Sequence, residues 1–320
     1  MQYTLSQNVR EFPVKNNMNI IFGPIHSRRF GKSLGVDLSP SKKQCNFDCL
    51  YCELDPAKTM GDQDEVLSVA TIASAIKKGL SEHQDIDFLT ITANGEPTLY
   101  PYLSELIDEI NKIKGNTKTL ILSNAATIDD IKVQEALLKL DEVKLSLDCA
   151  TQKCLKKLDR SHSGIEVENI KAGMLEFKSK YPGPLVIEIL IVKTLNDSEE
   201  EIAKLNEYLL KLQPTRIDIG TIDRPPAFDV KPVTYEELLY ISHLFDPALP
   251  VYIASRKKAD ISSDSYSYEE ILETLAKRPL TQEDIEALFD EESQKRAENL
   301  LHKQKIKQVE TNGVKFYKKV

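Results

Sequence analysis

The sequence is poor in cysteine, in long apolar runs and in positive charge. Only five of its 320 residues are cysteine, and no apolar run approaches the ~18 residues of a membrane span. The first residues, MQYTLSQNVREFPVKNN, lack the apolar core of a signal peptide. We therefore expect a cytoplasmic protein with no membrane partner, in which thiols stay reduced. The net charge of −8 excludes a general attraction to nucleic acid or anionic lipid, although a local basic patch could still bind them.

Short β-type runs alternate with longer helical patterns up to about residue 255. Seven runs rich in Val, Ile, Leu and Thr are predicted strands: 34–38, 87–93, 118–123, 142–148, 185–192, 216–222 and 251–255. Helical patterns between them include SVATIASAIKKGL, LSELIDEINKI, IKVQEALLKL and SEEEIAKLNEYLLKL. The last opens on Ser198, and Glu201 three residues later completes a capping box. The alternation predicts an α/β fold of about six parallel βα units, which suits an open or partly closed barrel.

The alternation of predicted strands and helices ends after residue 255. Residues 1–255 are predicted to form the barrel domain, 256–265 a polar linker, and 266–320 a small second domain. Three short helices are predicted near 267–277, 282–289 and 291–303, the second capped by Thr281, and a hairpin turn at Asn312-Gly313. Three helices and a two-stranded wing are the pattern of a winged helix. Its last 19 residues hold six lysines and one glutamate, so contact with nucleic acid phosphates is one hypothesis, and protein docking or a structural lid is the other.

Three of the five cysteines lie within eight residues, in the stretch CNFDCLYCEL. Cys45, Cys49 and Cys52 have the spacing C-x3-C-x2-C. A structural zinc site needs four ligands, and His26 is a candidate for the fourth. An iron–sulfur cluster normally takes four protein thiolates, so three on a 4Fe–4S cluster would leave one iron open to a ligand from outside the protein.

This stretch resembles the signature of the radical S-adenosylmethionine (SAM) superfamily, in which an aromatic residue, here Tyr51, precedes the last cysteine. The resemblance implies a partial TIM barrel, (β/α)6-like, with the cysteine loop after its first strand. It implies a 4Fe–4S cluster on Cys45, Cys49 and Cys52, whose open iron binds SAM. A partner such as flavodoxin or ferredoxin would supply an electron that splits SAM into methionine and a 5′-deoxyadenosyl radical, which abstracts hydrogen from substrate.

A second segment, ANGEPTL, looks like the Gly-Gly-Glu-Pro segment of the same family, although Asn94 stands where the first glycine is common. The resemblance implies that Asn94, Gly95, Glu96 and Pro97 hold the amino group of SAM, with Tyr51 on the adenine side. An ordinary strand-to-helix turn is the alternative. Polar residues that end later strands fall where relatives contact the ribose or carboxylate of SAM, or are simple caps: Ser123, Asn124, Ser146 and Asp148.

The run GPIHSRR…GKSLGVDL…CNFDCLYCEL…NGEPTL…SLD is similar to one branch of the superfamily. These are the iron–sulfur oxidoreductases grouped with enzymes that build the tricyclic wyosine base of tRNA. The similarity implies a tRNA substrate, and a protein substrate remains open. The competing hypothesis is a non-catalytic, metal-stabilised protein that binds nucleic acid.

Several further residues have two interpretations each. Basic side chains near the barrel mouth could bind an anionic substrate, or could form surface pairs: Arg28, Arg29, Arg160, His162 and Arg224. Cys149 could face the cavity and donate a hydrogen atom, but Cys149 and Cys154 are more simply small buried side chains. Asn196-Asp197 is expected to cap the helix that follows.

Overall fold

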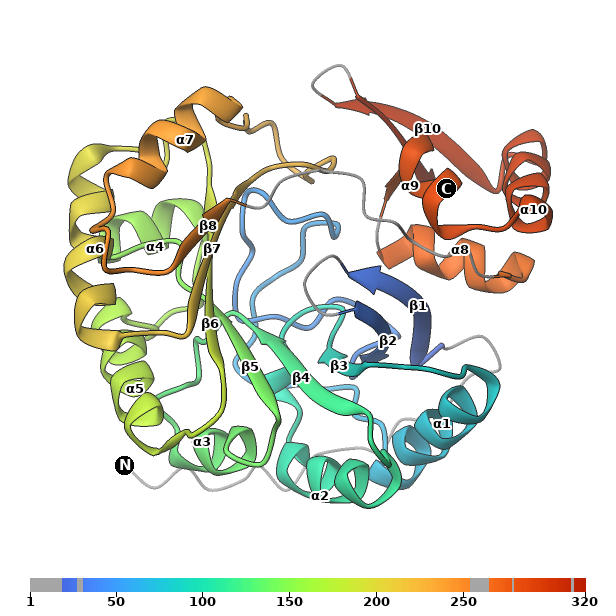
Figure 1. The fold of residues 1–320 in the computed structure, drawn as a ribbon, viewed down its shortest axis with the longest axis horizontal. Coiled ribbons are helices and arrows are strands. Elements are labelled where there is room, and N and C mark those ends of the chain that lie inside the picture. Colours follow the sequence, from blue (N-terminus) through green and yellow to red (C-terminus); the bar gives the residue numbers. More distant parts are fainter. Residues whose placement is uncertain (1–18, 28–30, 254–264, 278, 312–313) are drawn as a thin grey trace.

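A computed structural model describes residues 19–27, 31–253, 265–277, 279–311 and 314–320. Its main feature is a curved sheet of eight strands whose spatial order follows their order in the chain (Figure 1). The strands are β1 (Ile21–Ser27), β2 (Gly31–Asp37), β3 (Phe88–Thr92), β4 (Lys118–Ser123), β5 (Glu142–Ser146), β6 (Leu185–Ile191), β7 (Arg216–Thr221) and β8 (Val251–Ile253). β1 is antiparallel to β2, and β2 to β8 are all parallel.

Helices follow the parallel strands and cover the outside of the curve (Figure 1). They are α1 (Val69–Glu82), the short 3₁₀ turn η1 (Pro97–Leu99), α2 (Leu103–Ile113), α3 (Ile131–Leu137), α4 (Gln152–Leu158), α5 (Val167–Lys180), α6 (Glu199–Leu212) and α7 (Tyr235–His243). Six strand–helix units therefore run from β2 to α7, which confirms the predicted partial barrel. Within the described residues, no helix combines the length and the apolar character that crossing a membrane requires.

The two faces of the sheet differ because side chains alternate along each strand. The face toward the helices is fully buried and apolar, with Leu34, Leu89 and Ile187 at 0% exposure. The opposite, concave face carries paired charges. Lys144 Nζ lies 2.5 Å from Glu188 Oε1 and 3.5 Å from an Asp218 carboxylate oxygen. The interior of the curve therefore carries charged side chains among apolar ones.

All seven predicted strands are present, as β2 to β8, and β1 is an additional strand that the sequence analysis missed. The stretch IFGPIHS of β1 is interrupted by Gly23-Pro24, a pair that is typical of turns. β1 shifts its register against β2 between Phe22 and Ile25, so the interruption lies at a bulge.

The predicted capping box of α6 is only half present. Ser198 Oγ accepts a hydrogen bond from the Glu201 amide, as expected. The Glu201 carboxylate does not reach back to Ser198. It accepts hydrogen bonds from the amides of Ala150 and Thr151 and from the Thr151 hydroxyl, at 2.6–2.9 Å. Glu201 therefore ties the start of α6 to the chain that leads into α4.

The residues after 265 form a second set of elements around their own apolar cluster. They are α8 (Tyr268–Lys277), β9 (Leu280–Thr281), α9 (Gln282–Leu288), α10 (Glu291–His302), β10 (Ile306–Thr311) and β11 (Val314–Lys319). The strands form an antiparallel sheet in the order β10-β11-β9. Tyr266, Ile271, Leu275 and Phe289 lie in a cluster separate from the barrel core. We call residues 265–320 the C-terminal unit.

The predicted helices of the C-terminal unit are present to within a residue or two, and Thr281 caps α9 in a capping box with Asp284. The expected turn at Asn312-Gly313 lies outside the described residues, and Thr311 and Val314 pair on either side of it. Most of the expected linker, 256–265, also lies outside them. The domain limits therefore stay a prediction. α8 packs beside β1 (Figure 1), and the Tyr266 hydroxyl donates a hydrogen bond to the Pro24 carbonyl.

Glu201→Gln should lower the free energy of unfolding by about 1–3 kcal/mol, because one of its two accepting oxygens becomes an amide donor that faces backbone N–H groups. Glu200 is the matched control, since it is exposed on the same turn and pairs only with Lys204. Glu200→Gln should change the stability by less than about 0.5 kcal/mol. Urea unfolding of both variants measures the difference, and equal effects would show that the Glu201 contacts contribute nothing.

Candidate cluster and cofactor site

The cysteine loop follows β2 and is joined to the segment after β3 by a short parallel bridge. Gln44, directly before Cys45, bridges to Gly95. The Gln44 amide donates to the Asn94 carbonyl at 2.9 Å, and the Glu96 amide donates to the Gln44 carbonyl at 2.9 Å. The cysteine loop and the Asn94–Pro97 segment are therefore one structural piece at the carboxyl end of the sheet.

The side chain of Gln44 joins the start of the cysteine loop to the backbone of the residues at its end, Asp64 and Glu65. It is fully buried, and its Nε2 donates to Ser39 Oγ at 2.8 Å and to the Glu65 carbonyl at 2.9 Å. Its Oε1 accepts from the amides of Asp64 and Glu65. Sequence analysis missed Gln44, because a glutamine beside a cysteine has no local pattern that predicts such a role.

Gly95 is the residue at which the two segments approach most closely. Its φ is +137°, a conformation that side chains rarely adopt, and an added Cβ would lie 1.9 Å from the Gln44 carbonyl oxygen. Only glycine allows this approach. The single glycine that remains of the family pattern thus stands where the geometry requires one.

Cys45, Cys49 and Cys52 are free thiols, and nitrogen donors lie near the sulfur atoms of Cys45 and Cys52. The Phe47 amide lies 3.4 Å and Asn124 Nδ2 3.7 Å from Cys45 Sγ, and Lys43 Nζ lies 3.5 Å from Cys52 Sγ. Hydrogen bonds of this kind stabilise thiolate ligands of metal clusters.

Burial raises the pKa of the Cys45 thiol to about 12, with a further contribution from the negative charge of Glu96. Burial also raises the pKa of Cys49 well above its usual value, and the charges of Cys45 and Cys52 add to it. The three sulfurs are therefore close enough to affect one another. A metal centre binds thiolates, so its binding here must release protons.

The three thiols are not arranged as the ligands of a single tetrahedral ion in this structure. Ligands in a tetrahedral zinc site, about 2.3 Å from the metal, lie roughly 3.8 Å from one another. Among the described residues, these three sulfurs do not form a set within 4.8 Å of one another. The side chain of His26, the candidate fourth zinc ligand, lies outside the described residues.

Glu96 is buried and accepts hydrogen bonds from the predicted polar residues at the end of β4. It is 1% exposed. Its Oε1 accepts from the Ser123 hydroxyl at 2.7 Å and from the Thr98 amide and hydroxyl, and its Oε2 accepts from the Asn124 amide at 2.7 Å. Burial raises the pKa of Glu96, although these hydrogen bonds oppose the rise. The structure thus brings Glu96, Ser123 and Asn124 together, beside Cys45.

A second buried contact joins the cysteine loop to the end of β5. The Tyr51 hydroxyl donates to one oxygen of Asp148, and the Leu190 amide donates to the other at 2.7 Å. Burial raises the pKa of Asp148 to about 7. Ser146 lies two residues earlier, in register with Glu188 on the concave face. Tyr51, Ser146 and Asp148 therefore lie at one end of the sheet.

The profile of the radical SAM superfamily matches residues 41–205, just over half of the chain. The chain belongs to the radical SAM superfamily. A UPF0026 protein from Helicobacter pylori is 43% identical over 305 residues, covering 95% of this chain and 98% of the relative.

A solved structure shares the fold. A radical SAM methyltransferase from Sphaerobacter thermophilus has a TM-score of 0.55 at 13% identity and covers 72% of this chain and 68% of that one. The crystal structure of archaeal TYW1 has a TM-score of 0.46 at 18% identity and covers 66% of this chain and 70% of that one.

Among the basic side chains singled out in the sequence, Arg160 and Arg224 pair with carboxylates. Arg224 Nη1 donates to Glu53 Oε1 at 2.7 Å. Arg224 therefore forms an ion pair, which was the alternative to binding an anionic substrate. Arg160 lies 3.3 Å from the Asp48 carboxylate and over the ring of Phe228. His162 Nδ1 lies 3.1 Å from the Ser163 carbonyl oxygen. Arg28 and Arg29 lie outside the described residues.

Two expectations from the sequence are wrong. Asn196 does not cap α6. Its buried side chain accepts from the Val192 amide and donates to the carbonyls of Asp148 and Leu190. Cys149 and Cys154 are buried as expected, but they form a disulfide with a Cα–Cα distance of 5.5 Å. A hydrogen-donating role for Cys149 would require that bond to be reduced.

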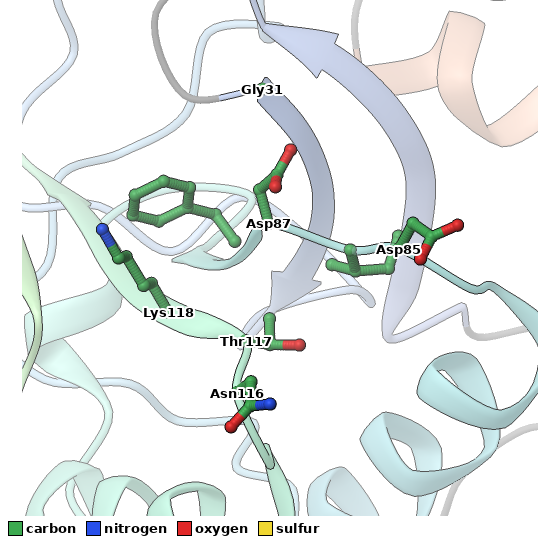
Figure 2. Close-up of a pocket in the computed structure, with 8 residues that line it drawn as sticks. Gly31, Asp85, Asp87, Asn116, Thr117 and Lys118 are labelled. Carbon is green, nitrogen blue, oxygen red and sulfur yellow. The ribbon is translucent and has the colours of Figure 1, made fainter.

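A hollow of about 600 Å³ lies at the opposite end of the sheet (Figure 2). It opens at the amino ends of β3 and β4, where Asp85, Asp87 and Lys118 line it. Asp87 Oδ2 already accepts from the Lys32 amide at 2.8 Å. This hollow is separate from the cysteine site, because the cysteine loop lies at the carboxyl ends of the strands. The carboxyl ends are also where functional groups of such barrels gather.

Gly95→Ala should displace the cysteine loop, because the new methyl group would overlap the Gln44 backbone. The expected result is a large loss of iron incorporated on anaerobic reconstitution, to below about a third of wild type, since the Cys45 position depends on Gln44. Gly61→Ala is the control, because Gly61 is in the same loop and nothing lies within 4 Å of its Cβ position. Normal iron content in both variants would contradict the role given to the bridge.

Proposed function

We propose that this protein is an enzyme that cleaves SAM reductively and uses the 5′-deoxyadenosyl radical to abstract hydrogen from a substrate. The observation that carries the proposal is the set of three free thiols on a loop bridged to the Asn94–Pro97 segment. Cys45, Cys49 and Cys52 would hold a 4Fe–4S cluster, and the cluster would supply the electron that splits the sulfonium of SAM. A small reducing protein such as flavodoxin or ferredoxin would be its electron source.

The side chains of this site have distinct proposed roles. Cys45, Cys49 and Cys52 hold the cluster, and the donors near their sulfurs stabilise the thiolate form. Asn94, Gly95, Glu96 and Pro97 hold the amino group of SAM, and Ser123 and Asn124 keep the Glu96 carboxylate oriented toward it. A buried carboxylate that faces an ammonium makes a strong charge-assisted hydrogen bond.

Tyr51, Ser146 and Asp148 form the proposed adenosine side of the same site. The Tyr51–Asp148 hydrogen bond fixes the ring beside the last cysteine, which orients SAM and keeps water out. Burial raises the pKa of Asp148, and its two oxygens hold the Tyr51 hydroxyl and the Leu190 amide in place. The substrate would enter along the concave, charged face of the sheet.

We further propose that the C-terminal unit is a winged helix that binds nucleic acid, and that a tRNA base is the substrate. The order of three helices with β9 between the first two and a terminal hairpin is that of a winged helix. Lys305, Lys307 and Lys315 are exposed on the hairpin, where they can contact phosphates. The unit lies beside β1 and the cysteine loop, with Lys318 3.8 Å from Asp55, so a bound RNA would be close to the barrel mouth.

Anaerobic reconstitution with iron and sulfide, followed by reduction with dithionite in the presence of SAM, should yield 5′-deoxyadenosine. Cys45→Ala, Cys49→Ala and Cys52→Ala should each abolish it. Glu96→Gln should weaken SAM binding about tenfold or more, since a charge-assisted hydrogen bond contributes about 1.5–3 kcal/mol. Glu105→Gln, at an exposed position on α2, should leave binding unchanged. One zinc per chain without iron would instead favour the non-catalytic, metal-stabilised protein.

Lys305→Gln/Lys307→Gln should weaken tRNA binding by the full-length protein to a similar extent for all sequences. The slope of log K against log salt should fall by about one for each lysine, because each phosphate contact releases a counterion. Lys204→Gln/Lys211→Gln, exposed on α6, is the control and should leave the slope unchanged. Filter binding between 50 and 200 mM salt, roughly the range over which such contacts weaken, makes the comparison. Equal slopes in both variants would assign the hairpin to protein docking.

A further inference from the structure

Asp37 ends β2 with a carboxylate that is buried at the junction of three segments. Its side chain is 2% exposed. Its Oδ1 accepts hydrogen bonds from the Ser39 amide at 2.9 Å and from the Asn94 amide at 2.8 Å. A carboxylate removed from water in this way costs several kcal/mol unless an opposite charge compensates it.

The compensating charge comes from the C-terminal unit. Lys277, the last residue of α8, places its Nζ 2.9 Å from Asp37 Oδ2. The same ammonium donates to the Asn19 carbonyl at 3.1 Å and lies 4.4 Å from the centre of the Phe22 ring. Carboxylate, carbonyl and aromatic face together surround the ammonium group, so its position is well defined.

The Asp37 carboxylate connects this lysine to the backbone of the proposed SAM site. The Asn94 amide is held by Asp37, and the Asn94 carbonyl accepts from the Gln44 amide. Gln44 is followed by Cys45, and Asn94 by Gly95 and Glu96. A shift of the Asp37 carboxylate would therefore move both the segment proposed to hold the SAM amino group and the first cluster ligand.

We propose that Lys277 is a positioning residue for SAM, which acts through Asp37 on the Asn94–Pro97 segment, so that the C-terminal unit completes the SAM site of the barrel. This inference rests on the proposed function, in that it takes Asn94–Pro97 as the segment that holds SAM. Substitution of Lys277 leaves a buried carboxylate without its counter-charge, and Asp37 then relieves the cost by rotating toward water. This rotation weakens its hold on the Asn94 amide.

The test measures the dissociation constant for SAM by equilibrium dialysis on full-length, iron-loaded protein, with iron per chain determined for each variant. Lys277→Met should raise the constant about tenfold, and Lys277→Arg, which keeps the charge, should stay within about threefold of wild type. Lys318→Met, which removes only the exposed contact with Asp55, should leave it unchanged. Normal SAM affinity in Lys277→Met, with only its melting temperature lowered, would overturn the proposal.

A second measurement separates this inference from the proposed function. Hydrogen exchange of the peptide that contains Asn94 should be faster in Lys277→Met than in wild type without any SAM, and Lys277→Arg should restore the protection. Wild-type protein that binds no SAM would defeat the proposed function, while the exchange result still decides whether Lys277 holds the segment. Unchanged exchange would overturn the inference. If Lys277→Met does not fold, Lys277→Gln keeps a donor toward Asp37 and replaces it in both measurements, with the same direction of change expected.

Discussion

Two backbone hydrogen bonds between Gln44 and the Asn94–Glu96 segment are the constraint on which the rest of the site depends. They join a loop that carries three thiols to a segment that carries a buried carboxylate. Gly95 makes the contact possible, because any Cβ there would overlap the Gln44 backbone. A long loop loses conformational entropy when it becomes ordered. The bridge anchors the cysteine loop to the rigid sheet and so fixes the position of the loop.

Buried carboxylates lie at the carboxyl ends of several strands, and each is satisfied in a different way. Glu96 relies on hydroxyl and amide donors, Asp148 on Tyr51 and a backbone amide, and Asp37 on a lysine from the C-terminal unit. Burial of such groups costs stability, so a fold that only needed to be stable would use apolar residues here. Their concentration at the carboxyl ends of the strands is typical of a site that binds a polar, charged ligand.

Local sequence was enough to predict the elements that depend on local patterns. The parallel strands are apolar runs of β-branched residues, and the cysteine spacing and the NGEP segment are contiguous, so both were found. β1 was not predicted, because its Gly23-Pro24 pair resembles a turn. Contacts between distant parts of the chain, such as Asp37 with Lys277, leave no periodicity or spacing in the sequence. The role of Asn196 in tying strand ends together and the Cys149–Cys154 disulfide likewise depend on which loops the fold brings side by side.

The central claim is that three thiols leave one iron of a four-iron cluster without a protein ligand. Mössbauer spectroscopy of anaerobically reconstituted, ⁵⁷Fe-labelled protein tests it most directly. About four irons per chain are expected, and addition of SAM should change the signal of one iron in the cluster and leave the other three unaltered. A spectrum that SAM does not change, or protein that takes up a single zinc ion in place of iron, would contradict the account.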